Sequence, residues 1–210
     1  MSYHIYQTEG IVLARRGWGE ANALYVLYTE QFGATQLFAK GVRLEKSKLR
    51  GRLNLFSHVR VRFVAGRDLY RLIDVQELAR ACRMSENMYR FQAASAVARF
   101  VKEVVSGQER DEAFWSLLLE AYDVLERCEF QPDGVLPFLY TFQIRSLRLL
   151  GYIPEECPVA VQDILDNQSL LPRRAIDRSA RQELDAFLAS IYPYATGSNG
   201  WASYAPSLAA

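Results

Sequence analysis

Positively charged side chains are the residues of this sequence whose number and spacing suggest a chemical role. Six of them fall within thirteen residues and are opposed only by Glu45; they are Lys40, Arg43, Lys46, Lys48, Arg50 and Arg52. Such a cluster suits the phosphates of a nucleic acid, and six contacts to a single strand would give log K a slope of about −4 against log salt. The alternative interpretation is a solvated surface loop without a ligand.

Other arginines are expected to extend this basic surface. Residues 58 to 63 alternate polar and apolar side chains, so one face of the expected strand is basic while the other enters the core. Further arginines lie just before a glycine turn at residues 17 to 19 and in the last expected strand. The DNA-binding residues predicted from these segments are Arg15, Arg16, Arg60, Arg62 and Arg71.

An aromatic side chain near these cations could stack on a base, as is common in proteins that bind single strands. Trp18 is the best candidate, because it lies in the glycine turn beside Arg15 and Arg16. The other candidates are weaker, since two of them are of a kind more often found in a core; they are Phe38, Phe56 and Tyr70.

Residue patterns typical of enzymes are scarce. The two histidines, His4 and His58, stand in neither a metal-binding nor a catalytic-triad spacing. Residues 41 to 47 read G-V-R-L-E-K-S, which lacks the second glycine of a phosphate-binding loop. Cys82, Cys128 and Cys157 are too widely spaced for a metal clip or a disulfide framework. We therefore expect a protein that is not an enzyme, uses no cofactor and occupies a reducing cytoplasm.

The net charge of +1 conceals an uneven distribution along the chain. Residues 1 to 80 hold 13 Lys and Arg against 7 Asp and Glu, whereas residues 81 to 210 hold 12 against 17. This asymmetry predicts a basic module joined to an acidic one. Neither a secretory signal nor a membrane span is recognisable, and we expect a soluble chain.

The first eighty residues have the short apolar stretches and glycine-containing breaks that are typical of strands. The segment from 44 to 55 favours a helix, because Lys, Leu and Arg are good helix formers, although Gly51 weakens this prediction. A helix between the third and fourth of five strands favours the OB-fold, a Greek-key barrel that often binds oligonucleotides. The strands are predicted at residues 5 to 14, 22 to 29, 34 to 40, 57 to 65 and 69 to 75.

After residue 78 the apolar period lengthens from two to about 3.6 residues, which predicts helices. Ser85 and Asp111 are expected to cap the first two, and the first is expected to bury a stripe that includes Met88 and Phe91. A third helix, at 133 to 150, is apolar around most of its circumference and is the expected centre of a bundle. The pattern fades into a loop at 154 to 174 before a last helix at 179 to 191.

The predicted fold class is therefore α+β with more than one domain. A five-stranded OB-fold barrel at residues 1 to 80 precedes an α-helical bundle domain at residues 81 to 192. Residues 193 to 210 are expected to form a loose C-terminal tail.

The N-terminal half also carries an ordered set of short motifs. They are T-E-G-I-V-L at 8 to 13, G-E-A at 19 to 21, L-Y-T-E-Q-F-G at 27 to 33, A-K-G-V-R at 39 to 43 and K-S-K-L-R-G-R-L at 46 to 53. As a set they resemble the RecO family of bacterial DNA repair and recombination mediators. Beyond residue 80 only L-L-G-Y at 149 to 152, followed by Cys157, resembles that family.

The resemblance implies an OB-fold and a helical domain that bind single- and double-stranded DNA and anneal complementary strands. It also implies that the protein, with RecR, helps RecA replace single-strand binding protein without using ATP, at the nucleoid. The clustered cations would contact the DNA backbone, and the C-terminal tail of single-strand binding protein would be a ligand of the helical domain. Many family members bind zinc through four cysteines, but only Cys157 remains near that place, so zinc is not predicted.

Three functional hypotheses follow. In the first, the basic face neutralises the phosphates of two strands at once, so that complementary bases can pair. The second is a non-catalytic adaptor, whose OB-fold and helical apolar groove bind protein partners. The third, a nuclease, would need clustered carboxylates and a metal, for which the sequence offers no motif.

Overall fold

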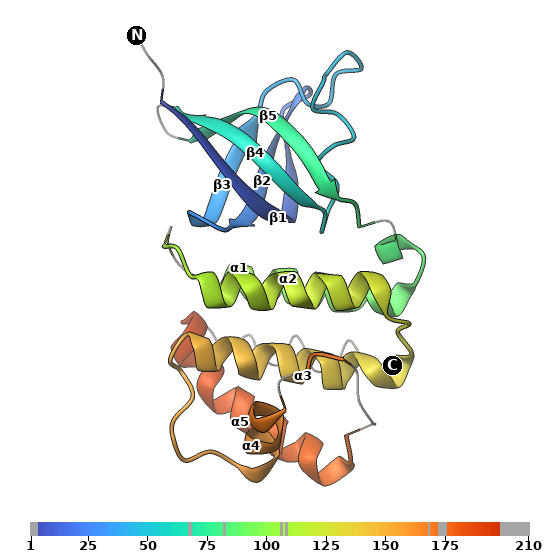
Figure 1. Cartoon of the computed structure of the whole chain (residues 1–210), viewed down its shortest axis with the longest axis vertical. Coiled ribbons are helices and arrows are strands. Elements are labelled where there is room, and N and C mark those ends of the chain that lie inside the picture. The colour runs from blue at the N-terminus through green and yellow to red at the C-terminus, as the bar shows by residue number, and fades with distance from the viewer. Residues whose placement is uncertain are drawn as a thin grey trace. The chain divides into compact units, whose positions relative to one another are not determined.

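The computed structural model describes residues 4–66, 69–81, 83–105, 107, 109–167, 169–171 and 176–197. The chain divides into two units, each with its own interior. Unit 1 consists of residues 1–82 and 105–115, and unit 2 consists of residues 83–104 and 116–210. Figure 1 shows that unit 1 contains the strands, whereas unit 2 is built from helices.

Unit 1 is a closed barrel of five strands in the order β1-β2-β3-β5-β4. Neighbouring strands are antiparallel except β3 and β5, which pair in parallel. This arrangement confirms the predicted five-stranded OB-fold barrel. The strands are β1 (Ile5–Trp18), β2 (Asn22–Thr29), β3 (Gly33–Ala39), β4 (His58–Ala65) and β5 (Tyr70–Ala79).

A bulge in β1 decides which of its residues face outward near the end of the strand. Val12 pairs with Leu27, but the register shifts before Ala14, so that Arg15 pairs with buried Tyr25. One extra residue in a strand exchanges its inward and outward positions. Arg15 therefore lies on the same side of the sheet as Tyr25, with its guanidinium carbon 5.7 Å from the centroid of the Tyr25 ring, although its side chain is exposed. Arg16, and with it Trp18, lies on the outer face.

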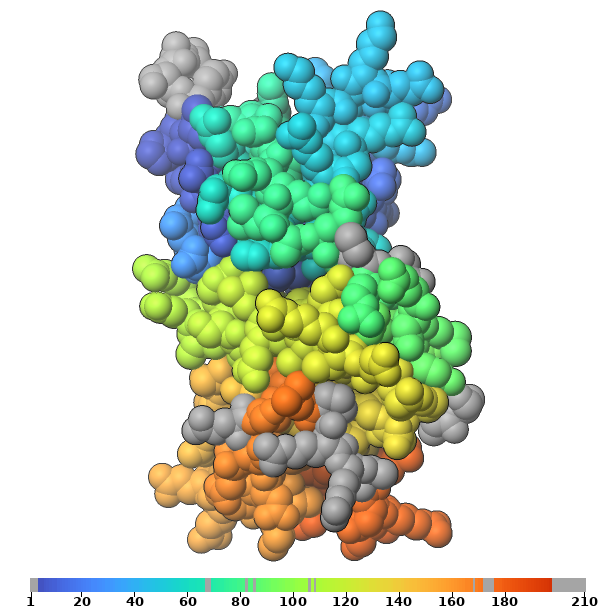
Figure 2. All heavy atoms as spheres, turned by 45° about the vertical axis from the view of Figure 1, so that its right-hand side comes forward, coloured from blue at the N-terminus to red at the C-terminus, as the bar shows by residue number. Residues whose placement is uncertain are grey.

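Residues 40–57, which we call the basic loop, form successive turns, so the helix predicted at 44 to 55 is wrong. The loop protrudes from the barrel surface (Figure 2). Leu44 and Leu55, at the two ends of the predicted helix, are exposed. Val42 and Leu53 instead join the barrel core. Backbone hydrogen bonds between residues three apart link Leu44 to Gly41, Ser47 to Leu44 and Arg50 to Ser47.

Residues 105–115 belong to the barrel unit although they follow a helix of unit 2. The ring of Phe114 lies 5.1 Å from that of Tyr28 on β2, and both are buried. Gly33, at the turn between β2 and β3, has a φ of 54°, and a Cβ atom there would come within 2.7 Å of the backbone oxygen of Glu109. Only glycine accommodates both the left-handed backbone and this close approach.

Unit 2 is built around α3, which is buried on most sides by α1, α4 and α5. This confirms the expected centre of the bundle. The helices are α1 (Met88–Val104), α2 (Glu112–Arg127), α3 (Pro132–Leu149), α4 (Val159–Asp166) and α5 (Arg178–Thr196), with a 3-10 turn η1 (Arg83–Ser85) before them. Asp111 caps α2 as predicted, because its side chain accepts a hydrogen bond of 2.8 Å from the Phe114 amide. Among the described residues, no helix is long and apolar enough to cross a membrane.

Several details of unit 2 differ from the sequence-based expectation. Asn87, not Ser85, caps α1, since its Oδ1 accepts hydrogen bonds from the amides of the second and third residues that follow. Met88 and Phe91 are exposed, whereas Ala94, Ala98 and Val101, further along the same predicted stripe, are buried.

The C-terminal part of the chain contains more helix than the sequence suggested. The segment from 154 to 174 contains α4, which buries Ala160 and Val161. Helix α5 continues to Thr196 and ends at Gly197 in a left-handed conformation, so the first residues assigned to the tail are helical. Residues 198–210 of that tail lie outside the described residues.

Candidate nucleic-acid interface

The six clustered cations of the basic loop all have exposed side chains. Within the described ranges, none of them lies within ion-pair distance of a carboxylate. Two of these cations donate hydrogen bonds to neutral backbone oxygens, Arg43 to Gly19 at 3.0 Å and Arg52 to Val75 at 3.5 Å. The cluster therefore keeps its positive charge available to an anionic ligand.

The start of the basic loop is fixed against the turn between β1 and β2. The Gly41 amide donates a 2.8 Å hydrogen bond to the side-chain oxygen of Asn22. The Arg43 amide donates a 2.9 Å hydrogen bond to the Ala21 carbonyl, and the Arg43 side chain reaches Gly19 in the same turn. These bonds place the loop cations beside the end of β1, which carries Arg15, Arg16 and Trp18.

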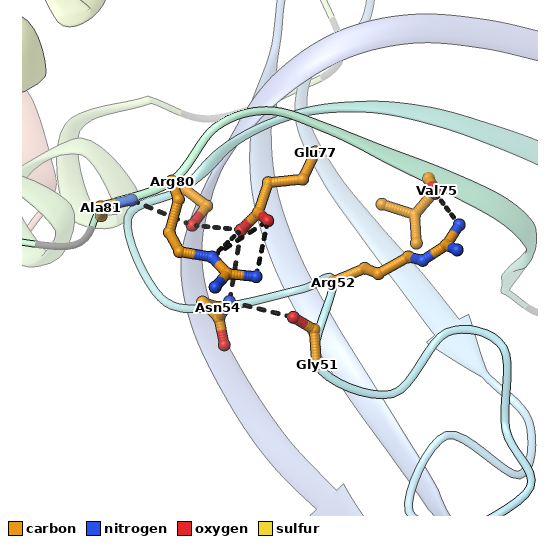
Figure 3. Close-up of polar contacts among 8 residues, drawn as sticks. Gly51, Arg52, Asn54, Val75, Glu77, Arg80 and Ala81 are labelled. Atoms are coloured by element: carbon orange, nitrogen blue, oxygen red, sulfur yellow. Dashed lines mark hydrogen bonds and ion pairs between the residues drawn. The ribbon is translucent and has the colours of Figure 1, made fainter.

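The end of the basic loop is fixed by Glu77 on β5 (Figure 3). Its carboxylate accepts hydrogen bonds from Asn54 at 3.3 Å, Ser57 at 3.5 Å and Arg80 at 2.9 to 3.2 Å. The bond from Arg80, with smaller contributions from the other two donors, lowers the pKa of Glu77 below its ordinary value. The loop is thus held at both ends, while the side chains of Lys46, Lys48 and Arg50 in its middle are exposed to solvent.

An aromatic pair lies on the outer face of the barrel next to this loop. Trp18 and Phe38 meet edge to face with ring centroids 6.2 Å apart, and we call this pair the aromatic strip. Trp18 remains 50% exposed. In the register of the sheet Arg16 pairs with Leu24, Leu24 with Phe38, and Phe38 with Arg71. The strip is thereby flanked by an exposed arginine on each side.

The arginines of β4 belong to a different and largely neutralised part of the barrel surface. Arg60 forms a 2.6 Å ion pair with Glu9 on β1, and Arg62 lies 3.9 Å from Asp74 on β5. The structure therefore groups ten predicted DNA-binding residues around the basic loop and the end of β1 or beside the strip, and it separates Arg60 and Arg62 from them by pairing each with a carboxylate.

His58 lies beside the same carboxylate and is half-buried. Its Nε2 atom lies 3.0 Å from Glu9, and its ring lies edge to face with Trp115 at 5.7 Å. Burial lowers the pKa of His58 below its ordinary value and outweighs the opposing attraction of Glu9.

A histidine whose pKa is lowered by folding stabilises the protein fully only above its unfolded pKa of about 6.5, and this contribution is lost as the pH falls toward the folded pKa. We expect the melting temperature to fall more steeply between pH 7 and pH 5 in the wild type than in a His58→Gln variant. Differential scanning fluorimetry across that range measures the slopes. His4→Gln, at the exposed second histidine, should keep the wild-type slope; equal slopes for both variants would contradict the assignment.

The structure also sorts the weaker aromatic candidates. Phe56 is buried, and Tyr70 packs against the barrel core, so neither offers a free ring face. Phe38 is the residue that sequence reasoning undervalued. Leu37 and Ala39 point into the core, and the strict alternation of a strand places the residue between them outside. That alternation was the signal that could have identified it.

Within the part of the chain that the structure describes, no group of three or more His, Cys, Asp or Glu side chains could hold a metal ion. Cys128 and Cys157 are free thiols. Cys82 lies outside the described residues.

Comparisons with known proteins agree with the geometry of unit 1. A family model described as Recombination protein O N terminal matches residues 1–81. A protein named DNA repair protein RecO from Rubrobacter xylanophilus is 32% identical over 150 residues, which cover 71% of this chain and 59% of that protein. The protein of the same name from Thermobifida fusca is 33% identical over 156 residues, covering 73% and 63%.

A third relative extends the same pattern at lower identity. DNA repair protein RecO from Symbiobacterium thermophilum is 28% identical over 150 residues, which cover 71% of this chain and 58% of the relative. The chain thus spans about three fifths of the length of these curated relatives. In each case the matched stretch is longer than the barrel alone.

Proposed function

Because the chain belongs to the RecO family, we propose that it acts in DNA repair and recombination by binding DNA through the barrel. The observation that carries this proposal is the basic loop. Its six cations are exposed, and the loop that carries them is held by hydrogen bonds at both of its ends. Within the described part of the chain, no carboxylate lies within ion-pair distance of these cations. Phosphate contacts of this kind supply affinity without requiring a particular base sequence.

The basic loop also supports strand annealing as the activity. Two complementary strands repel each other through their phosphates, and a cationic surface that binds both lowers this repulsion. Base pairing then supplies the driving force, so no covalent chemistry is needed. We propose on this basis that the protein is a mediator and not an enzyme.

Family membership supports two finer proposals about partners. The first is that the chain, together with RecR, helps RecA replace single-strand binding protein on DNA. The second is that the helical unit receives the C-terminal tail of single-strand binding protein. A RecA-loading assay on coated single strands, with and without RecR, tests the first, and a binding assay with the isolated tail peptide tests the second.

Annealing of two labelled complementary oligonucleotides tests the central proposal. We expect the wild type to accelerate annealing and a Lys46→Gln/Lys48→Gln/Arg50→Gln variant to lose at least about tenfold of that acceleration, since electrostatic steering changes association rates by about 10- to 1000-fold. These side chains are exposed and make no side-chain hydrogen bond or ion pair within the described residues. Unchanged annealing by the variant would refute the proposal.

A further inference from the structure

The aromatic strip is an exposed feature that packing of the barrel core does not require. Trp18 is the last residue of β1, its ring contacts that of Phe38, and neither ring belongs to the cluster of buried core side chains. A single exposed large side chain is common on protein surfaces and would not by itself define a ligand site. The arrangement of its neighbours provides the second observation.

Cations flank the strip on both sides in the register of the sheet. Arg16, Phe38 and Arg71 stand on one outer face of β1, β3 and β5, and Leu24 of β2 occupies the position between the first two. Neighbouring strands are about 4.8 Å apart, so the two arginines stand roughly 14 Å apart. Both arginine side chains are exposed, and within the described ranges neither has an ion-pair partner. Ring faces between two cations match a nucleic-acid strand, in which phosphates alternate with bases.

We propose that the aromatic strip binds unstacked bases of single-stranded DNA while Arg16 and Arg71 contact phosphates on either side. This inference rests on the proposed DNA binding by the barrel and adds a preference for one form of DNA. In a duplex each base is covered by its neighbours in the stack, whereas a single strand can turn a base face toward a protein ring. Each base stacked on an aromatic side chain raises affinity about 5- to 150-fold.

The strip and the basic loop form one continuous surface for a single strand. Arg43 of the loop reaches back to Gly19, the residue that follows Trp18. The two parts recognise different chemical groups, since the loop attracts phosphates of any DNA and the strip recognises base faces. Binding of a single strand therefore has a salt-sensitive part and a part that salt affects little.

A Trp18→Ala variant tests the strip with three probes: a labelled oligothymidine, an abasic oligonucleotide of the same length, and a duplex of the same length. We expect the variant to bind the oligothymidine about 5- to 150-fold more weakly. Binding of the duplex and of the abasic strand should change less than about twofold, because neither presents a free base face. Fluorescence anisotropy at fixed salt measures all three.

Two further variants separate stacking from folding and from general surface effects. Trp18→Phe keeps an aromatic ring and should retain most of the affinity for the oligothymidine. It also removes the Trp18 indole, so the part of the tryptophan fluorescence that stacked bases quench should be lost. Tyr194→Ala removes a ring that is 81% exposed in the helical unit and should leave all three affinities unchanged. A Trp18→Phe variant as weak as Trp18→Ala would overturn the proposal.

The failure of this inference can be distinguished from failure of the proposed function. Equal loss of duplex, abasic and oligothymidine binding in Trp18→Ala would show that the residue supports the surface without stacking on bases. No change with any probe would overturn the strip as a binding site while the basic loop kept its role. Absence of DNA binding by the wild type would remove the proposed function itself.

Discussion

Changing Lys46, Lys48 and Arg50 together to glutamine should weaken the binding of single-stranded DNA by about 50-fold near 0.15 M salt. Each phosphate contact to a single strand contributes about 0.7 to the slope of log K against log salt, so three lost contacts lower the slope by about 2. The wild-type and variant lines should converge near 1 M salt, where screening is nearly complete. At about 0.05 M salt the difference should reach several-hundred-fold.

Fluorescence anisotropy with a labelled oligonucleotide across a salt series measures both the affinity and the slope. The matched control is Lys102→Gln/Arg127→Gln/Arg178→Gln, which removes the same charge from exposed positions of the helical unit. It should change the slope by less than one phosphate contact. If the two triple variants weakened binding equally, net charge and not the basic loop would control affinity.

Gly33→Ala should lower the free energy of unfolding by about 2–5 kcal/mol. A left-handed backbone costs a non-glycine residue about 1–2 kcal/mol, and forcing an extra carbon into a filled space costs a further 1–3 kcal/mol or so. The atom that the new Cβ would meet, at 2.7 Å, is the backbone oxygen of Glu109, which cannot rotate away. Chemical denaturation measures this change, and the melting temperature should fall by roughly 5–15 °C.

Gly19→Ala isolates the two contributions. Gly19 has a φ of 63°, close to the 54° of Gly33, but a Cβ atom there would meet nothing within 4 Å. This variant should therefore lose only the backbone contribution of about 1–2 kcal/mol. Equal destabilisation of the two variants would show that the backbone of Gly107 and Glu109 does not press against the turn between β2 and β3.

The barrel could be predicted from sequence because each strand alternates inward and outward residues between glycine-containing breaks. Val59, Val61 and Phe63 all enter the core, as their spacing implied. The conformation of the basic loop could not be predicted in this way. Its Lys, Leu and Arg residues favour a helix locally, but the burial of Val42 and Leu53 in a core made by distant strands determines the path that the chain takes.

The positive charges of the candidate interface could be predicted from the sequence, whereas the ion pairs that neutralise two of them could not. Arg60 and Arg62 looked as free as the loop cations, yet Glu9 and Asp74 face them from neighbouring strands. Such pairs depend on the register between β1, β4 and β5, and no local pattern encodes it. Cross-strand register also brings Arg16 and Arg71 to the two sides of Phe38.

Errors in the helical unit have a similar origin. Met88 and Phe91 begin an apolar stripe of α1 whose later members Ala94, Ala98 and Val101 are buried, but these first two side chains are exposed. Near the start of α1 the buried side chain is that of Arg90, which donates hydrogen bonds to the Arg83 and Cys128 carbonyls. The apolar period alone could not distinguish these faces.

The assignment of residues 105–115 to the barrel unit means that each unit is assembled from two separate stretches of chain. No single cut can divide such a molecule into intact halves. A fragment ending at residue 82 would lack Phe114, which covers Tyr28, and would present that ring to water. Preparing the barrel unit alone therefore requires a new linker between residues 1–82 and residues 105–115, and truncation after residue 82 is not sufficient.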